Sequence, residues 1–313
     1  MLFPVLAMHI PDGFLSIPVS VIGWLLMIAL VAIALRQTRH QLGERQIPLM
    51  GILAAFVFAA QMINFPVAGG TSGHLLGGML IAALLGPWAA VLVMTCVLGV
   101  QGLLFQDGGL LTLGFNIVNM GIIGGFVGYA AYALVRRSAG TSPLAQLIGA
   151  GVGAWLSVVI ASAACALELA ISGTSPLEVA LPAMLGVHAL IGIGEALITV
   201  AALAFILQTR PDLAGEPSTV AAQGWGWIAA GLLIALASFA SPLADSNPDG
   251  LERVAADHGF ITLGEAPPYE LLPDYTVPFI RQEGVTTIAA GVVGVLVVAG
   301  VGFGVARLSG RRG

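Results

Sequence analysis

Residues 17–35 read IPVSVIGWLLMIALVAIAL, a run without a charged side chain. A helix of about 20 apolar residues crosses the roughly 30 Å hydrocarbon core of a membrane. Comparable runs recur along the chain, and the short one at 74–85 ends at Gly86-Pro87, a pair that stops helices. A further short apolar piece lies at 176–187, and its periodicity does not decide whether it is interfacial or re-entrant. The runs predict nine spans, at Ile17–Leu35, Ile47–Ile63, His74–Leu85, Trp88–Phe105, Gly114–Val135, Leu144–Ala170, His188–Leu207, Trp225–Leu243 and Val285–Ala306.

Composition places the chain in one class. Of its 313 residues, 58% are hydrophobic and only 9% are charged, whereas a soluble domain carries about 25% charged residues. We therefore expect an all-α, polytopic helical membrane protein, with about seven helices in an N-terminal core and two in a C-terminal module. Cys96 and Cys165 both lie inside apolar runs, which is typical of small core residues rather than of a disulfide.

The basic residues orient the chain. The chain has no lysine, so its eleven basic residues are all arginines. If nine spans follow an extracytoplasmic N-terminus, nine of these arginines fall on the same side of the membrane. Cytoplasmic loops of membrane proteins are rich in arginine, so that side is the cytoplasmic one and holds the C-terminus. We expect a multi-pass protein of the cell membrane in which the His9 segment and the loop before His74 share the extracytoplasmic face. The nine residues are Arg36, Arg39, Arg45, Arg136, Arg137, Arg210, Arg307, Arg311 and Arg312.

Composition also divides the chain. Residues 8–208 form a predicted membrane core, and the polar residues 209–224 form a predicted cytoplasmic linker. Residues 225–313 form a predicted two-span module whose extracytoplasmic loop, 244–284, holds eight acids and two arginines. Residues 1–7 lack the basic start of a signal peptide and are short for one, although Val5-Leu6-Ala7 resembles a cleavage site. We expect them to be a mis-assigned start or a removed extension.

A metal site is predicted at Met8-His9. A chain that begins Met-His offers three nitrogen donors in adjacent chelate rings: the amine, the deprotonated amide and the imidazole. His74 supplies the fourth nitrogen, and square-planar nitrogen ligation suits Ni²⁺ and Cu²⁺, with Co²⁺ as a variant. The amine is available only if Met8 is the mature N-terminus, so the prediction depends on the fate of residues 1–7.

Plainer interpretations compete with this one. A single histidine at a membrane interface is more often a hydrogen-bonded residue than a ligand, and the glycine-rich stretch before His74 is also typical of a flexible connection. Asp12 either accepts the free N–H of His9 or His74, as ligand histidines usually require, or forms a turn. Glu195 is an intramembrane carboxylate seven positions after His188, which predicts a supporting role or a hydrogen bond between helices.

Three motifs resemble the CbiM/NikM family, the substrate-specific components of cobalt and nickel energy-coupling-factor transporters. They are MHIPDGFL at 8–15, NFPV at 64–67 with GTSGHLLG at 70–77, and HALIGIGEAL at 188–197. The resemblance covers about residues 8–208 and implies that the Met-His pair and the loop histidine occupy the metal cavity, here Met8, His9 and His74. The supporting residues expected around them are Asp12, Asn64, Ser72, His188 and Glu195. The seven preceding residues are the departure from the family pattern.

The C-terminal module has a resemblance of its own. SNPDGLE at 246–252, followed by DHGF at 257–260 and PDY at 273–275, is similar to the small two-span CbiN/NikN component with its Pro-Asp-Gly-Leu-Glu signature. The chain thus resembles a fusion of the two components. That likeness implies that loop 244–284 acts on the metal-binding core, with Asp249, Glu252 and His258 as candidate gating residues. The competing interpretation is that the acids of this loop serve only to keep it soluble.

The implied function is capture of Ni²⁺ or Co²⁺ outside the cell and its release inward, with the ion as cargo and no permanent cofactor. A nucleotide-binding loop of the Gly-x-x-x-x-Gly-Lys type needs a lysine, which the chain lacks. The resemblance therefore implies two partners, a transmembrane coupling protein and a cytoplasmic ATPase, and no nucleic acid. The alternatives are a secondary transporter of an organic solute, for which no internal repeat is evident, and an intramembrane enzyme, for which no His-Glu-x-x-His run exists.

Overall fold

The computed structural model describes residues 8–41, 46–140, 142–209, 231–232 and 234–309, and this part of the chain is mainly helical. Six of its helical stretches are long and apolar enough to cross a membrane, which confirms an all-α polytopic membrane protein. They are Ile17–Arg39, Pro87–Phe105, Leu113–Ala139, Pro143–Ile171, Leu177–Thr209 and Glu283–Ser309. The predicted linker 209–224 and residues 1–7 lie outside the described residues, apart from Thr209.

The described helices and strands fall into an N-terminal and a C-terminal group. Those of the N-terminal part are α1 (Ile17–Gln41), α2 (Gln46–Gln61), β1 (Phe65–Val67), β2 (Thr71–Gly73), α3 (Gly78–Leu85), α4 (Pro87–Val100), η1 (Gln101–Phe105), α5 (Leu113–Ile117), η2 (Val118–Ile123), α6 (Gly124–Ala139), α7 (Pro143–Ile171) and α8 (Leu177–Thr209). Those of the C-terminal part are η4 (Ser241–Leu243), α10 (Gly250–Asp257), η5 (Ile261–Leu263), η6 (Pro273–Tyr275) and α11 (Glu283–Ser309).

The predicted spans correspond to helical stretches, with two corrections. The span predicted at 74–85 is helical only from Gly78 onward, because residues 74–77 form a loop held by side-chain hydrogen bonds. The unassigned piece 176–187 is the first part of α8, which continues through Pro182 without ending. At 1.5 Å per residue the 33 residues of α8 extend about 50 Å, more than the hydrocarbon core requires. Of the span predicted at 225–243, the described part includes the apolar helix Ile234–Leu243.

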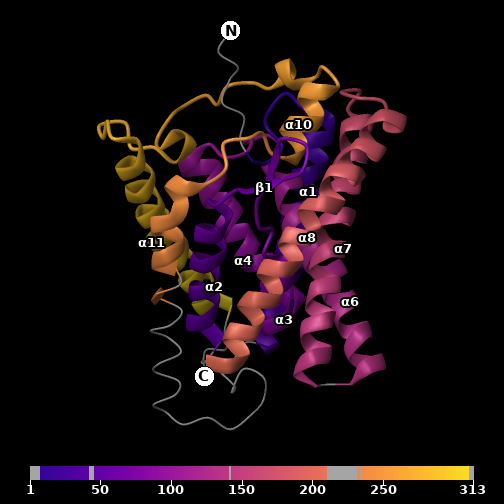
Figure 1. Ribbon diagram of the computed structural model, residues 1–313, viewed down its shortest axis with the longest axis vertical. Helices are drawn as coiled ribbons and strands as arrows, with labels where there is room; N and C mark the ends of the chain where they lie inside the picture. Colours follow the sequence, from indigo (N-terminus) through magenta and orange to yellow (C-terminus); the bar gives the residue numbers. More distant parts are fainter. Residues whose placement is uncertain (1–7, 42–45, 141, 210–230, 233, 310–313) are drawn as a thin grey trace.

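Figure 1 shows how the helices are arranged around α4. Helices α6, α7 and α8 lie side by side along one flank, and α2 and α11 lie along the other. Helix α10 caps the end of the molecule at which the hairpin of β1 and β2 lies, and it contacts both α8 and β2. Helix α11 of the C-terminal module thus packs directly on the core rather than standing apart from it.

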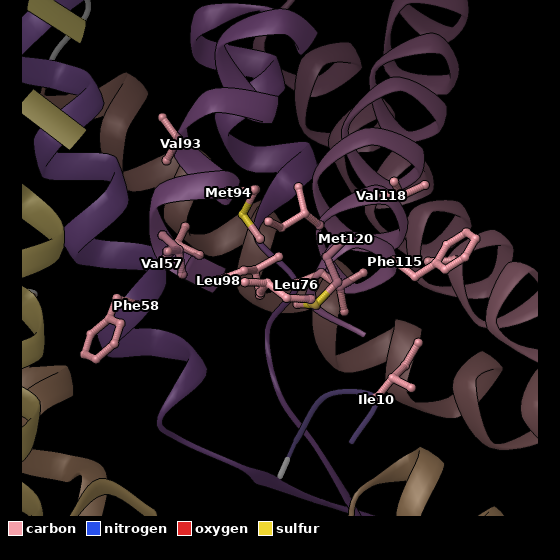
Figure 2. Packing of buried hydrophobic residues seen from close by; sticks show 14 of the residues in the cluster. Ile10, Val57, Phe58, Leu76, Val93, Met94, Leu98, Phe115, Val118 and Met120 are labelled. Carbon is pink, nitrogen blue, oxygen red and sulfur yellow. The ribbon is translucent and has the colours of Figure 1, made fainter. Parts of the chain in front are cut away.

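The buried apolar side chains form a core that extends toward the N-terminal segment. Figure 2 shows Leu76, Leu98 and Met120 converging at its centre, with Ile10 lying further along the same cluster. The module shares this core, because a Cβ placed on Gly294 of α11 would fall 2.1 Å from the ring of Phe58 on α2. The fused module is therefore built into the packing of the membrane core.

Small residues let α6 and α7 approach closely. A Cβ added to Gly153 of α7 would lie 2.4 Å from the carbonyl oxygen of Gly128 on α6. These glycines belong to the patterns Gly124-x-x-x-Gly128 and Gly149-x-x-x-Gly153, a spacing that permits close helix packing. The same spacing at Gly300 and Gly304 differs: within the part of the chain that the structure describes, no atom of another segment lies within 4 Å of a Cβ built on either glycine.

The G153A variant is expected to be less stable than the wild type. The added methyl group meets backbone rather than a flexible side chain, and overpacking of this kind costs about 1–3 kcal/mol. The matched control is G300A, which adds the same methyl group into open space and gains helix propensity. The midpoint of thermal unfolding in detergent measures the difference, and equal midpoints for the two variants would contradict the packing described here.

Candidate metal centre

The N-terminal segment is held inside the fold by its backbone. Asn116 of α5 bonds Ile10 twice: the Ile10 N–H donates to Asn116 Oδ1 at 3.0 Å, and Asn116 Nδ2 donates to the Ile10 carbonyl at 3.1 Å. The Gly109 N–H donates to the same carbonyl at 2.9 Å. Gly108 has a φ of 95°, and a Cβ there would lie 2.9 Å from the Cβ of His9. Glycine at 108 therefore permits the close approach of His9 to this loop.

Asp12 lies in a turn, as one of its two predicted roles requires, and its carboxylate does not bind a histidine. Its carboxylate accepts three backbone N–H groups, from Leu110 at 3.0 Å, Leu111 at 2.8 Å and Thr112 at 3.2 Å. These donors precede α5, where backbone N–H groups lack partners within the helix. The expectation that Asp12 binds a histidine was wrong; its carboxylate instead fixes the turn Pro11-Asp12-Gly13 to the start of α5.

Glu195 holds the loop that carries His74. Its two carboxylate oxygens accept the N–H groups of Leu76, at 2.6 Å, and Gly77, at 3.0 Å. The side chain is completely buried, and loop backbone at this depth must find its partners within the protein. Glu195 therefore holds the backbone of the loop that carries His74, and its supporting role at a metal site stays a prediction.

One cavity brings the predicted ligands together. Met8, His9 and His74 line it, together with His188 of α8 and Asp249 at the start of α10. The rings of His9 and His74 meet edge to face, with their centroids 5.4 Å apart. Both histidines are more than nine-tenths buried. The structure thus unites residues that are 65 positions apart in the sequence, as the shared extracytoplasmic face predicted.

Hydrogen bonds at Nδ1 prepare these rings for a ligand at Nε2. His9 Nδ1 lies 3.0 Å from Asp107 Oδ1 and donates to it, which leaves Nε2 buried and without a partner among the described residues. His188 Nδ1 donates to the Met184 carbonyl at 2.8 Å. His74 contacts carbonyl oxygens at both nitrogens, Leu75 at 3.1 Å and Met8 at 3.2 Å. A neutral ring can donate only once, so His74 donates to one of these two carbonyl oxygens and not to both.

Side chains alone do not complete a metal site here. Within the described residues, no three His, Cys, Asp or Glu side chains converge in a way that can hold an ion. The two imidazoles supply two nitrogens, and the main chain of Met8 and His9 lies at the same cavity. The arrangement accordingly suits an ion that accepts backbone nitrogen in a planar set, as Ni²⁺ and Cu²⁺ do.

The local electrostatics fit an ionised Asp107 beside a neutral His74. Burial raises the pKa of the Asp107 carboxyl, but its interactions with His9 and Tyr275 outweigh that effect and hold the pKa below its ordinary value. Burial, and then the neighbouring His9, lower the pKa of His74. A neutral imidazole is the form that binds a metal ion.

The Pro-Asp-Gly-Leu-Glu motif closes the cavity. Asp249 begins α10 with a reciprocal cap: its Oδ1 accepts the Glu252 N–H at 2.8 Å, and Glu252 accepts the Asp249 N–H at 3.0 Å. Asp249, Gly250 and Leu251 all line the cavity. A Cβ on Gly250 would lie 3.0 Å from His188 Nε2, so glycine at this position lets α10 lie against α8.

Ser72 ties that motif to the hairpin before His74. Its N–H donates to the Pro248 carbonyl at 2.8 Å, and its hydroxyl donates to the Asn247 carbonyl at 2.7 Å. Asn64 plays a similar part through its own carbonyl, which accepts the Asp245 N–H at 2.9 Å. Both residues therefore join the core to the module rather than approach the histidines.

Among the described residues, the candidate gating residues separate into two groups. Asp249 lines the cavity, whereas Glu252 contributes only through the cap, and His258 is an exposed residue at the end of α10. Sequence reasoning missed Asp107 and Tyr275, which bond each other at 2.6 Å. A signal for Asp107 existed: it is the one acidic residue between Glu44 and Glu168.

Sequence reasoning also missed the inner wall of the cavity. Asn119, on the π-helical turn η2, lines it and donates through Nδ2 to Glu168 Oε2 at 2.9 Å. Its Oδ1 is buried without a partner in the described part of the chain. π-helical turns within α-helices are frequent at functional sites.

Comparisons with known proteins agree on both parts of the chain. The family model CbiM, described as the cobalt uptake substrate-specific transmembrane region, matches residues 9–213, and the PDGLE domain matches residues 225–311. A putative fused nickel transport protein NikMN of Archaeoglobus fulgidus is 38% identical over 96% of this chain and 98% of its own. A cobalt transport protein CbiM of Sorangium cellulosum is 36% identical over 66% of this chain and 94% of its own. The crystal structure of a truncated transition metal transporter is 36% identical, has a TM-score of 0.57, and covers 64% of this chain and 98% of its own.

The E195Q variant is expected to lower stability by about 1–3 kcal/mol, the cost of leaving a buried backbone donor unpaired. An amide keeps one acceptor oxygen but turns an NH₂ group toward the second N–H donor. The control is E178Q, in the exposed first turn of the same helix. Thermal unfolding of both variants in detergent checks this, and an E195Q midpoint equal to that of E178Q would contradict the role of Glu195.

Proposed function

Because the chain belongs to the CbiM family of cobalt and nickel transport components and carries a PDGLE domain, we propose that it captures Ni²⁺ or Co²⁺ at an extracytoplasmic site made by Met8, His9 and His74. Met8 offers its amine, His9 its amide nitrogen and its imidazole, and His74 the fourth nitrogen. The ion is the transported substrate.

One observation carries this proposal: two buried imidazoles lie edge to face beside the Met8 backbone, and the Nε2 of one has no partner among the described residues. A buried polar atom without a hydrogen bond is costly, so an occupant that binds it stabilises the folded protein. Asp107 has the position that an outer carboxylate usually takes behind a metal-binding histidine.

The orientation and the energy source follow from the charges and from the missing lysine. Arginine-rich ends face the cytoplasm, which leaves the cavity, the hairpin and α10 on the outer face. A nucleotide-binding loop requires a lysine, and the 313 residues contain none. We therefore propose import driven by ATP hydrolysis on a partner ATPase, coupled through a second membrane protein. Uptake of labelled metal with and without those partners tests this step.

Loss of either imidazole is expected to abolish high-affinity binding. H9A and H74A each remove one nitrogen from a planar set, so the loss of affinity should exceed the roughly 10–100-fold that an outer hydrogen-bond partner contributes. H258A removes an exposed imidazole outside the cavity and should bind as the wild type does. Titration of the purified full chain with Ni²⁺ and with Co²⁺ measures all three variants. Wild-type affinity in both H9A and H74A would refute the site.

The state of residue 8 should also control affinity. A chain that starts at Met8 offers a free amine, whereas a chain that retains residues 1–7 offers an amide in its place. Intact mass identifies each species, and metal titration of the two should give clearly weaker binding for the extended chain. Equal affinity would exclude the amine of Met8 as a ligand while leaving the two histidines in place.

A further inference from the structure

Tyr275 reaches from the C-terminal module into the core beside the metal site. It is the last residue of the short turn η6, and its side chain is buried. Its ring stacks on Phe105 with centroids 4.8 Å apart and an interplanar angle of 19°. Its hydroxyl enters a chain of hydrogen bonds that ends at His9.

Each donor in that chain can be assigned. Gln101 Nε2 lies 3.1 Å from the Tyr275 hydroxyl, and an amide NH₂ group only donates. The single hydroxyl proton is therefore free for Asp107 Oδ2, 2.6 Å away. The other oxygen, Asp107 Oδ1, accepts from His9 Nδ1 at 3.0 Å. With both oxygens bound, the carboxylate plane is fixed, and with it the direction of the His9 ring.

We propose that Tyr275 of the fused module is a positioning residue for the metal ligand His9, acting through Asp107. The proposal rests on the function given above. Hydrogen bonds behind a ligand histidine set its tautomer and its orientation. Here the hydrogen bond that holds Asp107 behind His9 is donated by Tyr275, which belongs to the module and not to the core. Metal capture by the core thereby depends on the docked state of loop 244–284.

The backbone at Tyr275 supports a functional constraint. Asp274 and Tyr275 have φ values of 48° and 53°, in the left-handed region that non-glycine residues rarely adopt. Such residues are energetically unfavourable and collect at functional sites, where the surrounding structure holds them in place. The left-handed turn is the conformation in which the Tyr275 ring lies on Phe105 with its hydroxyl at Asp107.

Packing alone does not account for the hydroxyl. The stack on Phe105 would be equally good with phenylalanine, so Y275F separates the two roles. The same loop offers a matched control, because the exposed Tyr269 donates its hydroxyl to the Leu103 carbonyl at 2.9 Å. Y269F removes a hydroxyl that also joins the module to the core but has no link to Asp107.

The test is titration of the purified full chain with Ni²⁺ alone. D107N should lose about 10–100-fold in affinity, Y275F several-fold, and Y269F nothing, with each variant titrated below its own unfolding midpoint without metal. The ligand-field absorption band of bound Ni²⁺ should broaden in Y275F and not in Y269F, because the His9 ring is held less firmly.

A double mutant tests the relay, that is, the action of Tyr275 on His9 through Asp107, against an effect of Tyr275 that is independent of Asp107. In the D107N background, Y275F should have little further effect, since the two residues act in series. Additive losses, or a Y275F affinity equal to that of Y269F, would overturn the relay. H9A in the same titration tests the site itself: if H9A binds as the wild type does, the proposed function fails and the relay fails with it. If H9A loses binding while Y275F does not, only the relay fails.

Discussion

Irregular backbone buried in a membrane protein must have its polar groups satisfied by the protein itself, and the rest of this structure depends on that constraint. Two non-helical segments enter the core, one with His9 and one with His74. Asn116 and Asp12 satisfy the first, and Glu195 satisfies the second with both carboxylate oxygens. Without these bonds neither segment can remain at the depth at which the two imidazoles meet.

The fused module adds a second layer of support to the same place. Helix α10 covers the cavity with the Pro-Asp-Gly-Leu-Glu motif, Ser72 binds that motif to the hairpin, and Tyr275 reaches Asp107 from the far end of the loop. These contacts approach the cavity from different sides. A module linked in this way can hold the site ready for an ion, which gives a physical reason for joining the two components in one chain.

Much of the fold was predictable because apolar runs and helix-ending pairs are local signals. The proximity of His9 and His74 was also predictable, because the arginine distribution assigns both of their loops to the same side of the membrane. The isolated acid Asp107 could have been singled out from the sequence, but its role could not, because its partners lie 98 and 168 positions away. Asp12 was misassigned for the same reason: its partners are backbone N–H groups about 100 positions away, which no sequence pattern reveals.

The X-ray absorption spectrum of the Ni²⁺-loaded full chain, compared between the wild type and H9A, tests the central claim most directly. The account predicts a planar shell of four nitrogens that includes two imidazoles in the wild type, and loss of one imidazole from any ion that H9A still retains. An octahedral, oxygen-rich shell in the wild type, or an unchanged spectrum in H9A, would contradict it.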